Sequence, residues 1–170
     1  KLDSLFTADS KLEGESTSVD ISGLIGQYAH GNEPSHHIAH LYNYVGQPWR
    51  TQEIVDEVLH TLYFNNPDGL SGNEDCGQMS AWCILNAMGF YQVCPGKPVY
   101  SIGRPLFNEA TVHLKDGKSF KVIAHNNSRD NKYVRSIVLN GNKLETPFFT
   151  HQDIVDGGTL ELTMGSEPLK

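Results

Sequence analysis

The spacing of apolar residues changes along this chain, and that change restricts its possible folds more than any other feature. Before Pro95 apolar residues recur every three or four positions, as in RTQEIVDEVLHTLYF (50–64), which is typical of amphipathic helices. After Pro95 they alternate with polar residues, which is typical of strands. The pattern predicts an α+β fold, with a helical part over residues 1–94 and a β-rich part over residues 95–170.

Three segments of the first part are predicted to be helical, over residues 36–46, 50–64 and 76–90. The first should end before Pro48, and Thr51 is placed to cap the second. The third runs into Gly89, a common stop signal. Helices joined by polar loops are typical of a helical array or an α/α barrel. The polar stretch DSKLEGESTSVD (9–20) predicts a surface loop.

The β-rich part has its own internal order. Four alternating segments, ATVHL, SFKVIAH, VRSIVL and TLELTM, are separated by the turn sequences KDGK, NNSRDN and NGNK. Such short connections predict an antiparallel sheet that forms one face of a sandwich. THQDIVDGG (150–158) is expected to insert a short helical turn before the last strand.

Charge and hydropathy exclude some functions. Thirteen Lys and Arg against twenty Asp and Glu give a net charge of -7, so no basic field is available to hold a nucleic acid. No apolar run approaches the roughly 18 residues of a membrane-spanning helix. The sequence starts on Lys1 without an initiator methionine, which suggests part of a longer polypeptide. Any export signal would then precede Lys1.

Ligand-capable side chains crowd into HGNEPSHH (30–37). Pro34 favours an extended Glu33, so Asn32 and Glu33 can point from an irregular stretch into a cleft. Carboxylate and amide oxygens are the ligands that calcium prefers.

Histidine spacing permits a second interpretation, in which His36 and His40 grip zinc from one helical face with Glu33 as third ligand. The segment lacks the internal glutamate of an HExxH site, which weighs against zinc. A third interpretation is structural, with His40 and His60 hydrogen-bonded and packed among tyrosines.

A second polar cluster, in GLSGNEDCGQMSAW (69–82), comes directly before a predicted helix. Asn73, Glu74 and Asp75 follow a glycine-flanked turn, and amides at a helix N-terminus favour the anionic form of a carboxylate. Asp75 could simply cap the helix. The neighbouring acid and amide also suit a general base, a clamp on sugar hydroxyls or an oxygen-ligated cation.

Three long motifs, in order and at consistent separations, carry a resemblance: HGNEPSHHIAHLYNYVGQPWRTQ, GLSGNEDCGQMSAW and AMGFYQVCPGKPVYSIGRPLF. They resemble the C-terminal part of family 92 glycoside hydrolases, the calcium-dependent exo-acting α-mannosidases. The resemblance implies the last helices of an (α/α)6 barrel followed by a small antiparallel β-rich domain. It also implies an inverting enzyme, in which one carboxyl group protonates the leaving oxygen and another activates water.

The resemblance implies roles for particular residues. Asp75 falls at the position of the general base. Asn73, expected to be catalytic with it, falls where some members carry a second aspartate, and Glu74, expected to bind the substrate, falls where many have aspartate. The motif that approaches the terminal mannose and the calcium is matched by His30 and Glu33 for the sugar and by Asn32 and Glu33 for the metal. The calcium would bind the 2- and 3-hydroxyls of that mannose.

One part of the family's machinery has no match here. The general acid is a glutamate upstream of the HGNEP motif, and neither Glu13 nor Glu15 lies in a matching segment. We therefore expect the isolated chain to be incomplete and inactive, and to associate with the remainder of its polypeptide.

The expected substrate is an α-mannoside oligosaccharide, with α-1,2 linkages favoured. The expected location is the periplasm, the cell surface or the exterior of a bacterium. The alternative function is a non-catalytic carbohydrate-binding or structural module in which Asp75 caps and the histidines pack.

Overall fold

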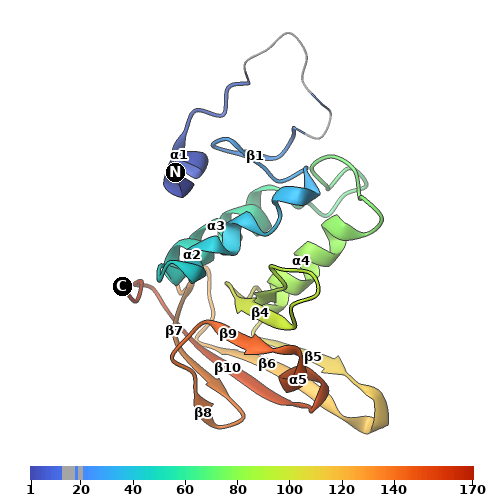
Figure 1. The fold of residues 1–170 in the computed structure, drawn as a ribbon, viewed down its shortest axis with the longest axis vertical. Helices are drawn as coiled ribbons and strands as arrows, with labels where there is room; N and C mark the ends of the chain where they lie inside the picture. Colours follow the sequence, from blue (N-terminus) through green and yellow to red (C-terminus); the bar gives the residue numbers. More distant parts are fainter. Residues whose placement is uncertain (13–17, 19–20) are drawn as a thin grey trace.

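The structure, a computed structural model, describes residues 1–12, 18 and 21–170. At the N-terminal end, helix α1 (Leu2–Thr7) packs beside a small hairpin of β1 (Leu24–Ile25) and β2 (Tyr28–Ala29) (Figure 1). Most of the loop predicted over residues 9–20, with Glu13 and Glu15, lies outside the described residues. No helix within the described part of the chain is long and apolar enough to cross a membrane.

The helical part contains short 3-10 turns η1 (Glu33–Ser35) and η2 (Ile38–His40) and helices α2 (Leu41–Tyr44), α3 (Pro48–Thr61) and α4 (Gln78–Met88). The two long helices α3 and α4 confirm two of the predictions. The helix predicted over 36–46 is wrong in its first half. The His36 carbonyl accepts from the Trp82 indole, at 3.0 Å, and the His40 amide bonds to the His37 carbonyl, in the i to i−3 pattern of a 3-10 turn.

The start of α3 also differs from prediction. Pro48 is its first residue, since proline lacks an amide hydrogen and is well suited to that position. Thr51 was predicted to be the cap, but it lies fully buried inside the helix, after the N-cap residue Gln47. The end of α4 agrees with prediction, because Gly89 has a φ of 103° and its amide bonds back to the carbonyls of Leu85 and Asn86.

The β-rich part has two sheets (Figure 1). A five-stranded sheet has the order β5 (Glu109–His113), β6 (Ser119–His125), β10 (Gly158–Gly165), β7 (Tyr133–Leu139), β8 (Asn142–Lys143), and a three-stranded sheet has the order β3 (Phe90–Tyr91), β4 (Val99–Ile102), β9 (Phe148–Thr150). The four predicted strands are confirmed as β5, β6, β7 and β10. The predicted helical turn is confirmed as α5 (His151–Val155).

The expectation of a wholly antiparallel sheet is wrong for one pair of strands. β10 pairs antiparallel with β7 and parallel with β6. β6 and β7 run in opposite directions, so a strand inserted between them must be parallel to one of the two. Since β9 and α5 come between β7 and β10 in the chain, the last strand enters the sheet from a second layer.

Both sheets contribute to one apolar core, in agreement with the predicted sandwich. Phe120 of β6 stacks on Phe149 of β9 with ring centroids 5.8 Å apart, and Ile102, Leu160 and Leu162 are fully buried. A second core, centred on Trp82, lies among α1, the β1–β2 hairpin and the helices. β3 lies before Pro95 and pairs with β4 after it, and the division into domains at residue 95 stays a prediction.

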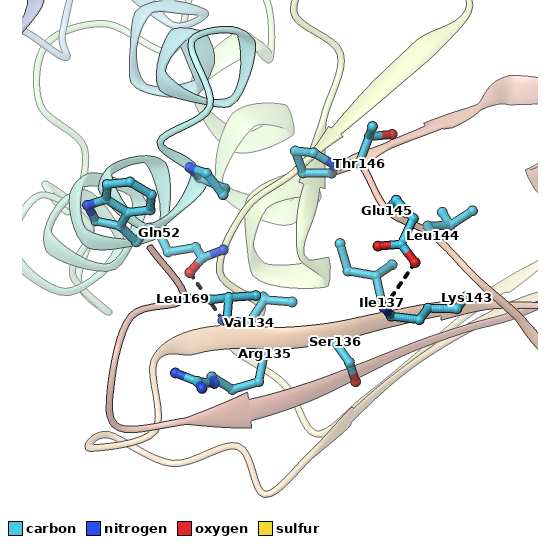
Figure 2. Close-up of a pocket in the computed structure, with 13 residues that line it drawn as sticks. Gln52, Val134, Arg135, Ser136, Ile137, Lys143, Leu144, Glu145, Thr146 and Leu169 are labelled. Atoms are coloured by element: carbon cyan, nitrogen blue, oxygen red, sulfur yellow. Dashed lines mark hydrogen bonds and ion pairs between the residues drawn. The ribbon is translucent and has the colours of Figure 1, made fainter.

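Helix α3 is fixed to the large sheet by polar contacts at its first two turns. The Gln52 side-chain oxygen accepts from the Val134 amide at 3.1 Å (Figure 2), and the Tyr133 hydroxyl donates to Glu53 at 2.8 Å. Farther along α3, Asp56 forms an ion pair with the buried guanidinium of Arg104, with 3.0 Å between Oδ1 and Nε. These contacts set how the helical part sits on the sheet.

Replacing Gln52 with leucine should destabilise the chain by about 1–3 kcal/mol, because the buried Val134 amide would lose the side-chain oxygen that accepts its hydrogen. Urea unfolding of the two proteins measures the difference. Gln152→Leu, at an exposed position of α5, is the matched control and should change stability by less than about 0.5 kcal/mol. Equal destabilisation by the two substitutions would contradict the role given to Gln52.

Candidate functional site

The two polar segments singled out in the sequence lie against each other in the structure. The indole of Trp82 packs edge-on against His30, with centroids 4.4 Å apart, and donates to the His36 carbonyl. Gln78, the first residue of α4, places its side-chain nitrogen 3.0 Å from Nδ1 of His36. Trp82 and Gln78 of α4 thereby hold the HGNEPSHH segment in place.

His30 is fully buried, and both of its ring nitrogens are bonded. Nε2 lies 2.7 Å from the Tyr63 hydroxyl, which itself donates to the Met79 carbonyl at 3.0 Å. Nε2 must therefore carry the hydrogen, and Nδ1 accepts from the Tyr28 hydroxyl at 2.9 Å. Direct contact between His30 and a sugar stays a prediction. Because both ring nitrogens are bonded within the chain, the geometry favours a supporting position for His30 beneath the site.

The tautomer of His36 is fixed by the same reasoning. Its Nε2 lies 2.9 Å from the His30 carbonyl, which can only accept, so Nε2 carries the hydrogen. Nδ1 is then an acceptor, and the Gln78 amide group must turn its NH2 towards it. The imidazole rings of His30 and His36 stack with centroids 4.6 Å apart.

The buried imidazoles are held in the neutral form. Burial, with a smaller contribution from the neighbouring His36, lowers the pKa of His30 to about 3. Burial also lowers the pKa of His36, with partial compensation from the His30 carbonyl and from the charge of Asp75.

Asp75 lies in a strained turn before α4. It has a φ of 53°, Cys76 has 56° and Gly77 has 93°. A left-handed conformation costs of the order of 1–3 kcal/mol at a residue other than glycine, and such strain gathers at functional sites. The N-cap position belongs to Gly77. Asp75, which is half-buried, is a carboxylate held at a defined position before the helix.

The neighbours of Asp75 differ in their roles. The carboxylate of Glu74 accepts from the Ser80 amide at 2.9 Å and from the Ser80 hydroxyl at 2.8 Å, so it stabilises the first turn of α4. Asn73 is exposed. The predicted contact of Glu74 with substrate and the catalytic role of Asn73 both stay predictions.

A hollow of about 370 Å³ opens beside this network. Its lining includes the exposed Glu33, the edge of His36, and the side chains of Gln78 and Tyr91, with apolar walls from Pro34, Val93 and Pro95. The hollow thus combines polar groups with apolar walls, as pockets for small ligands do. Asp75 lies three residues before the lining residue Gln78.

Sequence reasoning missed Gln78 and Tyr91. Both lie inside the quoted motifs, in GNEDCGQ and in AMGFYQV. Tyr91 follows the glycine that ends α4, and its place in β3 brings it back towards the start of that helix, where Gln78 donates to its hydroxyl at 3.0 Å. Gln78 lies three residues after the candidate base Asp75, and that spacing could have identified it from the sequence.

The oxygen donors of Asn32 and Glu33 suit calcium in kind. The Asn32 carbonyl already accepts from the Ser35 amide and hydroxyl, which leaves the Asn32 amide and the Glu33 carboxylate. Among the residues that the structure describes, no three His, Cys, Asp or Glu side chains gather as a metal site. This chain can therefore offer part of a calcium shell, and its other ligands would come from elsewhere.

The zinc interpretation is wrong. His36 and His40 do not share one helical face, because the segment between them forms 3-10 turns. The two nitrogens of His40 bond to Ser101 at 3.1 Å and to Asn86 at 2.8 Å. Those of His36 are equally engaged, so neither ring has a free lone pair for a metal.

A mixed α/β fold and a hollow lined by the carboxylate of Glu33 fit part of a glycoside hydrolase, and comparison with known proteins shows that class. A family model described as the glycosyl hydrolase family 92 catalytic domain matches residues 1–166. The chain therefore belongs to glycoside hydrolase family 92, as the motifs indicated.

Solved structures of this family share its fold. The family GH92 α-mannosidase BT3965 from Bacteroides thetaiotaomicron, in complex with mannoimidazole, is 44% identical with a TM-score of 0.91, over 99% of this chain and 22% of that chain. The inverting mannosidase BT2199 from the same organism is 42% identical with a TM-score of 0.82, over 98% of this chain and 24% of that chain.

A curated relative is more distant. An uncharacterized secreted glycosidase from Arthroderma benhamiae is 31% identical over 140 residues, which are 81% of this chain and 18% of the relative. The chain thus spans about a fifth of the length of the proteins it matches.

Acid should destabilise the chain through its buried histidines. Burial lowers the pKa of His40 to about 4 and that of His30 to about 3. Below about pH 6.5 the unfolded chain therefore binds protons that the folded chain does not bind. Stability falls as the pH drops from about 6.5 towards 4, by up to about 1.4 kcal/mol per pH unit for each group.

Urea unfolding across that range, for the wild-type chain and for His40→Gln, checks this expectation. The variant should lose stability less steeply with falling pH, since one of the buried histidines is gone. Parallel curves for the two proteins would show that His40 does not contribute.

Proposed function

We propose that this chain supplies the general-base side of the active site of an inverting, calcium-dependent exo-α-mannosidase that removes terminal mannose, with α-1,2 linkages as its main substrate. The observation that carries the proposal is the placement of Asp75, a carboxylate in a strained turn three residues before Gln78, which lines a hollow of mixed polar and apolar walls. Family membership supports the reaction class, and the relative called an inverting mannosidase supports inversion.

In the proposed mechanism Asp75 removes a proton from the attacking water. The water then attacks the anomeric carbon from the face opposite the leaving oxygen. The general acid comes from outside this chain, and the two carboxyl groups of an inverting pair lie about 6.5–9.5 Å apart to admit the water. Burial lowers the pKa of His36, so this ring adds no positive charge that would weaken Asp75 as a base.

Calcium held in part by Asn32 and Glu33 would supply positive charge for the 2- and 3-hydroxyls of the terminal mannose. Glu33 lies exposed at the hollow, where its carboxylate can accept from a sugar hydroxyl or bind the metal.

The remainder of the polypeptide is the proposed partner, including the other helices of an (α/α)6 barrel. Phe64 and Ile84 are 58% and 59% exposed, and they line a largely apolar hollow of about 400 Å³ between the α3–α4 loop and α4. Apolar surface of this kind marks a site of packing. We place the missing helices over it.

We further propose that the whole protein acts outside the cytoplasm, in the periplasm, at the cell surface or as a secreted enzyme. The fungal relative described as a secreted glycosidase supports export.

Asp75→Asn in the full-length parent should lower kcat/KM for α-1,2-mannobiose by about 100- to 10,000-fold, the usual worth of general-base catalysis. Binding of mannobiose should persist. Asp68→Asn, at an exposed acid in the same loop, is the matched control and should keep wild-type activity. An Asp75→Asn variant with full activity would leave the carboxylate without a catalytic role and favour the non-catalytic alternative.

Mannose release by the parent should cease after chelation with EDTA and return when calcium is added. The first product seen by proton NMR should be β-mannose, because the proposed mechanism inverts the anomeric centre. Activity that is indifferent to EDTA would exclude the calcium role, and initial α-mannose would exclude inversion.

A further inference from the structure

We propose that Gln78 and Tyr91 form a binding pair for one sugar hydroxyl in the hollow beside Asp75. This inference rests on the proposed function, and it gives the site a specificity element on α4 and β3. Both side chains line the hollow, and the Gln78 nitrogen lies 3.0 Å from the Tyr91 hydroxyl oxygen.

A one-way series of hydrogen bonds fixes how the pair faces the hollow. The His30 carbonyl accepts from Nε2 of His36, so Nδ1 of His36 must accept from Gln78. The second hydrogen of the Gln78 NH2 goes to the oxygen of Tyr91. Both amide hydrogens of Gln78 are thereby used, and the Gln78 amide cannot flip without facing its oxygen to the lone pair of Nδ1.

One hydrogen-bond acceptor and one donor of the pair remain for a ligand. The side-chain oxygen of Gln78 has no recorded donor among the described residues, and the hydroxyl hydrogen of Tyr91 has no recorded acceptor there. A sugar hydroxyl both donates and accepts, so it can give its hydrogen to Gln78 and receive that of Tyr91. Neighbouring Glu33 offers a second acceptor, and Pro34 and Val93 offer apolar contact for the sugar ring.

The pair is organised before any ligand arrives. Gln78 is at the first position of α4, and Tyr91 is only 9% exposed within β3. Side chains already held in place lose little conformational entropy on binding. A substrate that lacks the hydroxyl would leave the polar groups of Gln78 and Tyr91 unpaired. The free-energy cost of such unpaired groups is how enzymes reject substrates that lack one hydroxyl.

The test uses the full-length parent with Tyr91→Phe and, separately, Gln78→Met. Each should lower kcat/KM about tenfold or more, the effect of one lost hydrogen bond to a substrate hydroxyl. Substrates are α-1,2-mannobiose and 4-nitrophenyl α-mannoside. Tyr100→Phe and Gln152→Met, which lie outside the hollow, are the matched controls and should retain wild-type kcat/KM.

The two substrates identify which ring is bound. A loss with both assigns the pair to the terminal mannose, and a loss with mannobiose alone assigns it to the penultimate sugar. Wild-type kcat/KM for both variants on both substrates would overturn the proposal.

Deoxy-mannosides separate binding from a structural role. With the analogue that lacks the bound hydroxyl, Tyr91→Phe should cost almost nothing further. An equal penalty with every deoxy sugar would show that the substitution acts by disturbing His36, and would overturn the proposal.

A parent protein that hydrolyses no α-mannoside would contradict the proposed function, and the binding pair would then need a separate test. The pair is then judged by calorimetric titration with methyl α-mannoside. Binding that weakens about tenfold in Tyr91→Phe supports the pair, and absent or unchanged binding rejects it.

Discussion

The need to satisfy every nitrogen of two buried imidazoles controls the arrangement of this molecule. His30 and His36 lie where a charge would be costly, and each finds one donor and one acceptor, for four partners in all. Those partners come from the β1–β2 hairpin, the segment after α3 and the start of α4. The same bonds that stabilise the neutral rings therefore bring distant parts of the chain together.

These hydrogen bonds explain why the segment 30–37 is so rich in polar side chains although His30 and His36 are buried. Its backbone carbonyls at His30 and His36 are acceptors for side chains, so they are not available for an α-helix. The segment forms 3-10 turns that leave Glu33 at the hollow. Within this segment His30 and His36 are buried and hydrogen-bonded, whereas Glu33 is exposed.

Local signals predicted much of the fold. Apolar periodicity located α3, α4 and four strands, and Gly89 marked the end of α4, because these features depend on near neighbours in the chain. The 3-10 turns at 36–40 could not be foreseen, since they depend on a bond from Trp82. The parallel pairing of β10 with β6 also depends on long-range topology.

The candidate site divides in the same way. Residue type and position singled out Asp75 and Glu33; Glu33 lines the hollow, and Asp75 precedes the lining residue Gln78 by three positions. The orientation of these side chains could not be predicted from the sequence, and neither could the bonds from Ser80 to the Glu74 carboxylate. The sequence does not show whether a carboxylate bonds to a helix or to a ligand. Gln78 and Tyr91 became visible only when the direction of each hydrogen bond was known.

The central position of β10 bears on the order in which this protein can be made. Both neighbours of β10, β6 and β7, leave the ribosome before it does. Until it arrives each presents an unpaired edge, and open edges of this kind invite pairing with other chains. The nascent sheet is therefore most exposed to aggregation just before its final strand emerges, so it depends on rapid completion or on a chaperone during that interval.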